Sequence, residues 1–174
     1  MYFINFPTVG HDVKGDGVLT QMTDITRRAR VSENSIVYSA SYDYYDVGDG
    51  ERPEDIAYDF YGDSNLHWIV LMVNNIKDVY TDWPMSVTRL ESFVKSKYVS
   101  ANDIHHYEIY QDSGDTTVII ELPSDAATVK PAGAVAITNY EYEEAQVEKK
   151  RRIRLIRPEF VPSLKEEFRK SIRT

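Results

Sequence analysis

Residues 53–75 constrain the fold most, because they predict two short helices joined by a tight turn. Pro53 stands where a first helical turn tolerates proline, and Glu54 and Asp55 put negative charge at the positive end of the helix dipole. Apolar residues then recur at helical spacing, as one stripe formed by Pro53, Ile56, Ala57, Phe60 and Tyr61. Gly62 suits a left-handed cap, so we predict the first helix over 53–61.

The second helix follows almost at once. Ser64 can cap it, and the interior from Leu66 to Val73 is apolar except for His67, which is typical of a helix buried on most sides. Asn74 and Asn75 end it. We interpret His67 as a buried or half-buried histidine bonded to backbone, rather than a metal ligand or a general base.

A strand is predicted before these helices and a third helix after them. Strand-like alternation places Ile36, Tyr38, Ala40, Tyr42 and Tyr44 on one face, and a turn at 48–50 ends the strand. A short connection through Val79, Tyr80 and Trp83-Pro84 leads to a helical stretch with Val87, Leu90, Phe93 and Val94 at helical spacing. Strand, helix, helix and short strand thus form one compact unit.

The flanking regions carry weaker signals. We expect residues 1–35 to be an irregular arm, in which 23–30 is either a helical turn or extended. Residues 106–111 and 116–122 predict a β-hairpin, and a region rich in Pro, Gly and Ala follows over 123–136. Thr138 and Glu141 suit a capping box for a helix over 139–150. A short extended segment then precedes an amphipathic helix, whose apolar residues are Val161, Leu164, Phe168 and Ile172.

These elements predict an α+β fold in a chain of 174 residues, which is long enough for one domain or two small subdomains. The segments are an N-terminal arm (1–35), a core with its following helix (36–100), a hairpin and loop region (101–136) and a C-terminal helix-strand-helix docking segment (137–174). No apolar run approaches the roughly 18 residues that a membrane span needs. We therefore expect a soluble protein that is not exported and does not contact membranes.

The residue inventory argues against catalysis. The chain has no cysteine, which excludes thiolate zinc sites and cysteine nucleophiles, and it lacks the common nucleotide, hydrolase and metalloprotease motifs. His105 and His106 are neighbours on a predicted strand and should point to opposite faces, so the pair is not expected to chelate one metal. Carboxylate pairs such as Asp55 and Asp59 are attributed to solvated surface. We predict no catalytic residue, no metal and no cofactor.

Charge is distributed unevenly along the chain. Residues 149–174 hold 10 Lys and Arg against 3 Asp and Glu, whereas residues 1–148 hold 10 against 25. An acidic body argues against nucleic acid as a partner. The basic end could instead dock on an acidic or groove-bearing protein, or its side chains could cover the protein's own core. The hypothesised interface residues are Lys149, Lys150, Arg151, Arg152, Arg154, Arg157 and Phe168.

Three stretches together resemble a LysM module, which is a β-α-α-β unit; they are Tyr44 to Asp49, Pro53 to Gly62 and Leu66 to Asn75. In free-standing LysM modules, the loops after the first strand and after the second helix hold N-acetylglucosamine polymers. By position, those loops here consist of Gly48, Asp49, Gly50, Glu51 and Arg52, and of Asn75, Ile76, Lys77 and Asp78. The first loop departs from the usual Gly-Asp-Thr-Leu pattern, which counts against sugar binding.

A second resemblance covers roughly 40–100 and 137–174. The stretches Arg52 to Ala57, His67 to Met72, Trp83 to Ser86, Thr138 to Glu144 and Lys149 to Pro158 are similar to the LysM-containing baseplate wedge subunit of T-even-type contractile-tailed phages. This resemblance implies a structural virion protein in the tail baseplate, synthesised in the host cytoplasm. It also implies multiple copies in a symmetric ring. Each copy would bridge neighbouring wedges and the wedge core bundle, and its partners would be other baseplate wedge and inner baseplate proteins.

Two other functions stay open from the sequence. A peptidoglycan-binding LysM protein would use the two loops to grip the cell wall, and it would need aromatic platforms and amides along a groove. A wall hydrolase would need two carboxylates in a cleft, one of them with a raised pKa.

Overall fold

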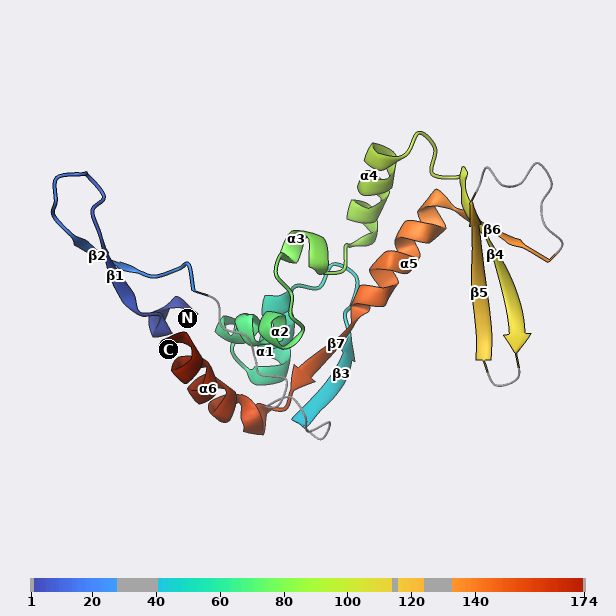
Figure 1. Ribbon diagram of the computed structural model, residues 1–174. Coiled ribbons are helices and arrows are strands. Elements are labelled where there is room, and N and C mark those ends of the chain that lie inside the picture. Colours follow the sequence, from blue (N-terminus) through green and yellow to red (C-terminus); the bar gives the residue numbers. More distant parts are fainter. Residues whose placement is uncertain (1, 28–40, 114–115, 124–132, 174) are drawn as a thin grey trace. The chain divides into compact units, whose positions relative to one another are not determined.

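The computed structural model describes residues 2–27, 41–113, 116–123 and 133–173 (Figure 1). The chain forms two compact units, one built from Met1–Trp83 with Arg152–Thr174 and the other from Pro84–Arg151. Helices and small antiparallel sheets occur in both, which confirms the predicted α+β class. The boundaries of the four segments predicted from the sequence differ from those of these units. The division into four segments stays a prediction.

The first unit contains three kinds of element: two small antiparallel pairs of strands, several helices and short 3-10 turns. They are η1 (Phe3–Asn5), β1 (Thr8–His11), β2 (Thr20–Thr23), β3 (Tyr42–Asp46), α1 (Pro53–Tyr61), η3 (Ser64–Leu66), α2 (His67–Val73), α3 (Val79–Asp82), β7 (Arg152–Ile156), η5 (Pro158–Phe160) and α6 (Val161–Arg173).

Helix α1 has the predicted bounds. The Asp55 side chain accepts a hydrogen bond from the backbone N–H of Arg52 at 3.2 Å, which satisfies a free donor at the helix start. Gly62 adopts φ +74° and its N–H donates to the Tyr58 carbonyl at 2.8 Å, as expected for a left-handed cap. Pro53, Ile56 and Ala57 are buried, so the predicted apolar stripe faces the core.

Helix α2 is buried as predicted, but its cap differs. Asp63, rather than Ser64, caps the turn by accepting a hydrogen bond from the N–H of Asn65 at 2.9 Å. The reason is that a 3-10 turn begins at Ser64 and precedes α2, so the capping position moves one residue toward the N-terminus. Asn74 follows the last residue of α2, and Asn75 adopts φ 53°, which confirms the predicted end.

The strand that closes the compact unit comes from far along the sequence. Residues 79–82 of the predicted connection form the short helix α3, which Asp78 caps by accepting from the N–H of Tyr80 at 2.9 Å. The partner of β3 is instead β7, paired antiparallel from Tyr42 opposite Ile156 to Asp46 opposite Arg152. The second compact unit is therefore inserted between α3 and the closing strand.

The last helix packs on its own chain. Val161, Leu164, Phe168 and Ile172 of α6 are all buried in the core of the first unit. The Phe168 ring lies 4.8 Å from that of Trp68 and 5.3 Å from that of Tyr2, measured between centroids. The N-terminal turn η1 and helix α6 thus lie side by side (Figure 1).

The N-terminal segment is more regular than expected. Strands β1 and β2 form a hairpin in which Thr8 pairs with Thr23 and His11 with Thr20. The Asp12 carboxylate accepts hydrogen bonds from four backbone N–H groups over residues 14–17, at 2.6 to 3.2 Å, and these bonds fix the turn. The expected irregular arm was wrong over these residues because the sequence offered no apolar alternation. Residues 28–35 of the arm and 36–40 of the predicted strand lie outside the described residues.

The second unit combines two helices with a sheet of strand order β5-β4-β6. Its elements are α4 (Val87–Lys97), β4 (Ile104–Ser113), β5 (Thr116–Pro123), β6 (Val135–Thr138) and α5 (Asn139–Arg151). The predicted hairpin is confirmed, since β4 pairs antiparallel with β5 from His106 opposite Pro123 to Ser113 opposite Thr116. Within the described ranges, no helix has both the length and the apolar character that crossing a membrane requires.

Helices α4 and α5 pack through Leu90, Val94 and Val147. The predicted capping box of α5 is confirmed: Glu141 accepts from the Thr138 N–H at 2.8 Å, and the Thr138 hydroxyl accepts from the Glu141 N–H at 3.2 Å. The buried Glu143 accepts hydrogen bonds from the Lys97 ammonium at 2.6 Å and the Tyr98 hydroxyl at 2.8 Å. This ionic contact joins the two helices.

Candidate interaction surface

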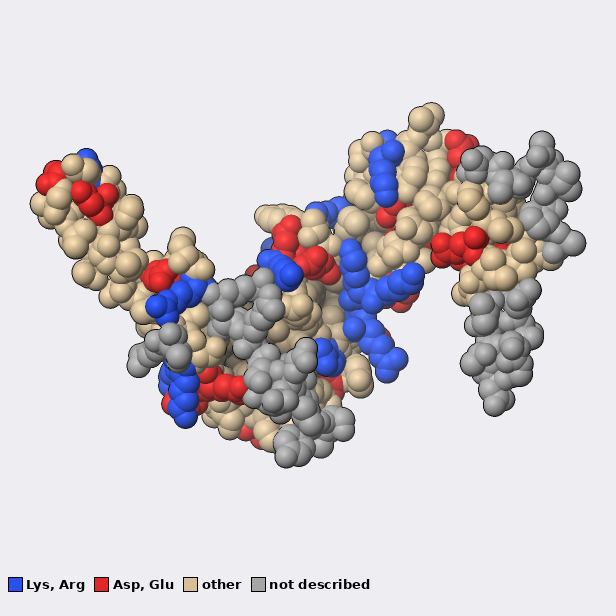
Figure 2. Space-filling model, viewed as in Figure 1, with Lys and Arg blue, Asp and Glu red and all other residues tan. Residues whose placement is uncertain are grey.

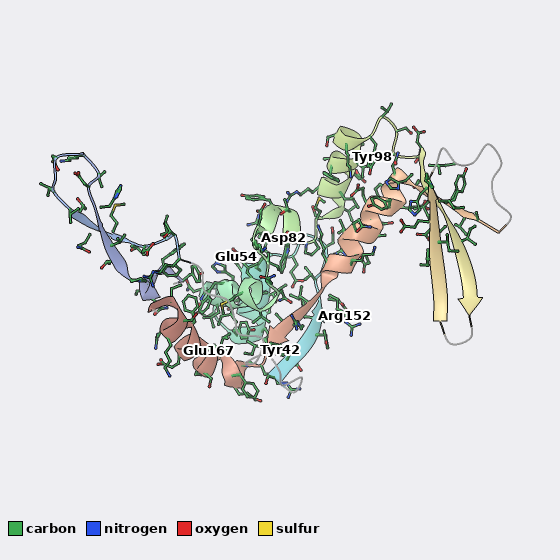
Figure 3. The ribbon with its side chains drawn as sticks, in the orientation of Figure 1. Tyr42, Glu54, Asp82, Tyr98, Arg152 and Glu167 are labelled. Atoms are coloured by element: carbon green, nitrogen blue, oxygen red, sulfur yellow. The ribbon has the colours of Figure 1, made fainter. Side chains whose placement is uncertain are left out.

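One face of the β3–β7 sheet combines tyrosine and arginine side chains. Tyr44 lies opposite Arg154 in the register, and Tyr42 and Arg152 occupy positions two residues along their strands on the same face. We call Tyr42, Tyr44, Arg152 and Arg154 the Tyr–Arg face. Figure 3 shows Tyr42 on β3 and Arg152 on β7.

The arginines of this face are held over the tyrosine rings. The Arg152 guanidinium carbon lies 4.8 Å from the Tyr44 ring centroid, and that of Arg154 lies 5.8 Å from the Tyr42 centroid. Tyr44 is 68% exposed and Arg152 is exposed, whereas Tyr42 is buried. Because Tyr and Arg contribute most at protein interfaces, a rigid exposed pair such as Tyr44 and Arg152 can anchor a protein partner.

The other predicted interface cations belong to the same stretch of sequence, residues 149–157, which we call the basic segment. Figure 2 shows where Lys and Arg side chains lie on one face of the molecule. Lys149 is exposed and Lys150 half-buried at the end of α5, where Arg151 pairs with Glu148 at 2.9 Å. Arg157 pairs with Asp43 at 3.2 Å. Asp46 lies opposite Arg152 in the register of β3 with β7, so this segment carries carboxylate neighbours as well as cations.

Phe168 differs from the other predicted interface residues. It is 3% exposed and belongs to the aromatic core of the first unit. Sequence periodicity identified the apolar stripe of α6 correctly but could not tell that η1 and α2 cover it. Phe168 is therefore not accessible to a partner protein on the folded chain.

The first of the two loops that the sequence suggested for sugar binding, residues 48–52, forms hydrogen bonds within itself and to its neighbours. One Glu51 carboxylate oxygen accepts from the Gly48 N–H and the other from the Tyr45 hydroxyl, both at 2.7 Å. The hydrogen bond to Glu51, together with partial burial, raises the pKa of Tyr45 to about 12. The Trp83 indole N–H donates to the Glu51 carbonyl at 2.9 Å, and the Trp83 residue is only 6% exposed. Asp49, Gly50 and Arg52 are exposed or partly exposed around this closed turn.

The second loop is similarly occupied. The Asp82 carboxylate accepts from the N–H groups of Lys77 and Asp78, at 2.9 and 3.2 Å. Asp78 caps α3, and Ile76 packs against the core while its N–H donates to the Leu71 carbonyl. Asn75 holds the left-handed backbone position between α2 and this loop. The carboxylates of Asp78 and Asp82 are thus engaged in shaping this loop.

Asp55 and Asp59 are both exposed on α1, and the Asp55 carboxylate accepts the hydrogen bond from the Arg52 N–H at the start of that helix. His67 is half-buried with its Nδ1 2.9 Å from the Ser64 carbonyl oxygen, which confirms a histidine bonded to backbone.

The prediction that His105 and His106 point to opposite faces was wrong. A β-bulge relative to β6 makes His105 an extra residue of strand β4. Their Nδ1 atoms lie 2.9 Å apart.

Sequence reasoning found the arginines of the Tyr–Arg face but not the tyrosines beneath them. The alternation of Tyr42 with Tyr44 and of Arg152 with Arg154 was the available signal. It became informative only once β3 and β7, which lie more than a hundred residues apart in sequence, were paired.

The exposed Tyr and Arg side chains on the β3–β7 sheet are of the kind found at protein–protein interfaces, which is the class of surface that a structural protein uses. Residues 1–130 match the family of base plate wedge protein 53 of phages. The chain therefore belongs to this family, which makes it a structural component of the phage tail baseplate and an associate of other baseplate proteins in the virion. A comparison with curated proteins finds no match.

Proposed function

We propose that this baseplate wedge protein bridges neighbouring wedges and the wedge core bundle, with the Tyr–Arg face and its flanking basic residues as one docking surface. The observation that carries the proposal is the exposed Arg152–Tyr44 pair on β7 and β3, at 4.8 Å. Its positive charge and planar groups suit an acidic protein surface on the wedge. Family membership supports association with other baseplate proteins.

The first unit would supply this surface on a LysM-like scaffold. Its order β3-α1-α2-β7 matches the strand-helix-helix-strand order of that module, with the second unit inserted before the closing strand. In a contractile tail of the T-even type, several copies would meet heterologous neighbours, and such contacts close into a ring when the rotation between neighbours permits it. Synthesis would take place in the host cytoplasm before assembly.

Co-assembly in producing cells tests the proposal. Tagged wild-type protein should recover other tail proteins from lysate, identified by mass spectrometry, without muramic acid in the eluate. Arg152→Glu with Arg154→Glu should remove those proteins, because charge reversal repels an acidic partner. Lys95→Glu with Lys165→Glu makes the same change in net charge outside residues 149–157 and should co-assemble normally.

Two results would count against the proposed surface. Normal co-assembly of the Arg152 and Arg154 double variant would exclude the Tyr–Arg face as a docking site. Recovery of peptidoglycan without tail proteins would instead favour the saccharide-binding alternative. The tryptophan fluorescence of Trp68 and Trp83, both in the first unit, verifies that each variant is folded.

A further inference from the structure

A β-bulge in the second unit aims a buried histidine at two carboxylates. Between Ile104 and His106 the register with β6 shifts, so β4 carries one extra residue there. Bulges re-aim side chains and are enriched beside functional sites. His106 is 7% exposed, and its Nε2 lies 3.3 Å from a carboxylate oxygen of Glu108. The imidazole is therefore held with one nitrogen toward the acidic pair.

The two carboxylates lie directly across from each other. Glu108 on β4 pairs with Glu121 on β5, and His106 stands two residues before Glu108 on the same face. Like charges at opposed positions of an antiparallel pair destabilise it unless a positive charge lies between them. One ligand atom from each of His106, Glu108 and Glu121 lies within 4.8 Å of the other two. The arrangement is thus suited to a cation that all three side chains share.

The spacing also agrees with tetrahedral metal coordination. Bonds of about 2.1 Å in a tetrahedral zinc site place neighbouring ligand atoms about 3.4 Å apart. The separation of 3.3 Å between His106 Nε2 and Glu108 Oε1 is close to that value, and it is long for a hydrogen bond between nitrogen and oxygen. Small side-chain rotations of Glu121, which is exposed, would complete three protein ligands.

The surroundings of His106 supply an outer shell. Its Nδ1 lies 2.9 Å from Nδ1 of His105, whose ring stacks on Tyr142 with centroids 3.9 Å apart and an interplanar angle of 9°. Because these two Nδ1 atoms lie within hydrogen-bond distance, the His105 ring can accept a hydrogen bond from His106 Nδ1–H. Metal-binding histidines commonly donate their second nitrogen in this way, which leaves Nε2 free to bind.

We propose that His106, Glu108 and Glu121 bind one divalent transition-metal ion, with zinc the best match, across strands β4 and β5. The imidazole nitrogen favours zinc over the hard cations Ca²⁺ and Mg²⁺, which prefer all-oxygen sites. Water fills the remaining coordination position. The ion neutralises the opposed carboxylates and fastens β4 to β5, which is a structural role independent of the proposed docking surface.

Calorimetric titration of the full chain with zinc chloride at neutral pH tests this site. We expect one zinc ion per chain. Binding should weaken at least about tenfold in His106→Gln and in Glu121→Gln. His105→Phe keeps the aromatic stack on Tyr142 but removes the outer-shell acceptor, and it should weaken binding about tenfold. His11→Gln and Glu144→Gln change the same residue types at exposed positions and should bind as the wild type does.

X-ray absorption of the zinc-loaded wild type needs no variant and gives an independent reading. One imidazole with oxygen ligands at bonding distance is the expected first shell. The absence of saturable zinc binding, a first shell with two or more imidazoles, or unchanged affinity in Glu121→Gln would each overturn the proposal. Circular dichroism shows whether a variant that fails to bind is folded.

Discussion

The side chain of Asn74 and the backbone of Arg154 are joined by two hydrogen bonds of 2.8 Å each. The Asn74 amide nitrogen donates to the Arg154 carbonyl, and its oxygen accepts from the Arg154 N–H. The same nitrogen donates to the Val70 carbonyl at 2.8 Å. Asn74 thus acts as a short strand partner for β7 and fastens the end of α2 to a strand that follows the inserted unit.

Replacement of Asn74 should destabilise the first unit. Asn74→Ala leaves the part-buried N–H and carbonyl of Arg154 without these partners, so we expect a loss of about 2 to 4 kcal/mol in the free energy of unfolding. Urea unfolding followed by tryptophan fluorescence measures it, because Trp68 and Trp83 both belong to the first unit. Asn75→Gly is the matched control: its φ of 53° suits glycine, so its effect should be small. A loss below about 1 kcal/mol for Asn74→Ala would contradict this role.

Truncation of Phe168 should be more costly than truncation of an exposed phenylalanine. Phe168→Ala opens a cavity between α6, Trp68 and the N-terminal turn, and such changes cost about 3 to 5 kcal/mol. Phe160→Ala, at a residue 37% exposed, should cost much less. Tryptophan fluorescence during urea unfolding compares the two. Similar small losses would mean that α6 does not complete the core.

The Glu143 carboxylate should make the second unit sensitive to acid. Burial raises its pKa, but hydrogen bonds from Lys97 and Tyr98 outweigh burial and hold the pKa below its ordinary value of 4.5. A lowered folded pKa means that this contribution to stability is full above about pH 4.5 and is lost as the pH falls through the folded pKa. Hydrogen exchange of α5 amides should therefore quicken on acidification.

A variant isolates this effect. Glu143→Gln keeps an acceptor but loses the ionic bond to Lys97, so we expect α5 to be less protected at neutral pH, by about 1 to 3 kcal/mol, and less dependent on acid. Glu144→Gln, an exposed neighbour, should retain the wild-type pH dependence. Equal acid sensitivity in the wild type and Glu143→Gln would assign the effect to other groups.

The closed first loop should be visible in tyrosine titration. Tyr45 should ionise near pH 12, because its hydroxyl donates to Glu51, whereas an ordinary tyrosine ionises near pH 10. The ultraviolet difference spectrum between the wild type and Tyr45→Phe identifies its titration. Glu51→Gln should lower this pKa, and Glu54→Gln, an exposed change on α1, should not.

The same shift has a consequence for stability. Because the folded pKa is raised, the contribution of Tyr45 is full below about pH 10 and is lost as the pH rises through about 12. Removal of the Tyr45 hydroxyl should therefore matter less under strongly alkaline conditions than at neutral pH. Titration of Tyr45 near pH 10 in the folded wild type would show that its bond to Glu51 does not form in solution.

Most helices and the β4–β5 hairpin follow from local sequence signals. Helices α1, α2, α4, α5 and α6 and the β4–β5 hairpin were predictable, because their caps, apolar spacing and turn residues act within a few residues of chain. The Pro53 start and Gly62 end of α1 are examples, as is the capping box of Thr138 with Glu141. The cations of the basic segment were equally visible as composition.

The contacts between those elements could not be predicted and are seen only in the folded chain. The pairing of β3 with β7 and the burial of Phe168 each join residues far apart in sequence. Periodicity indicates that a face is apolar or charged, but the free energy that selects its partner comes from burial and strand pairing over the whole chain. For this reason the arginines were predictable as a charged segment, whereas the tyrosines beneath them and the carboxylates facing His106 were not.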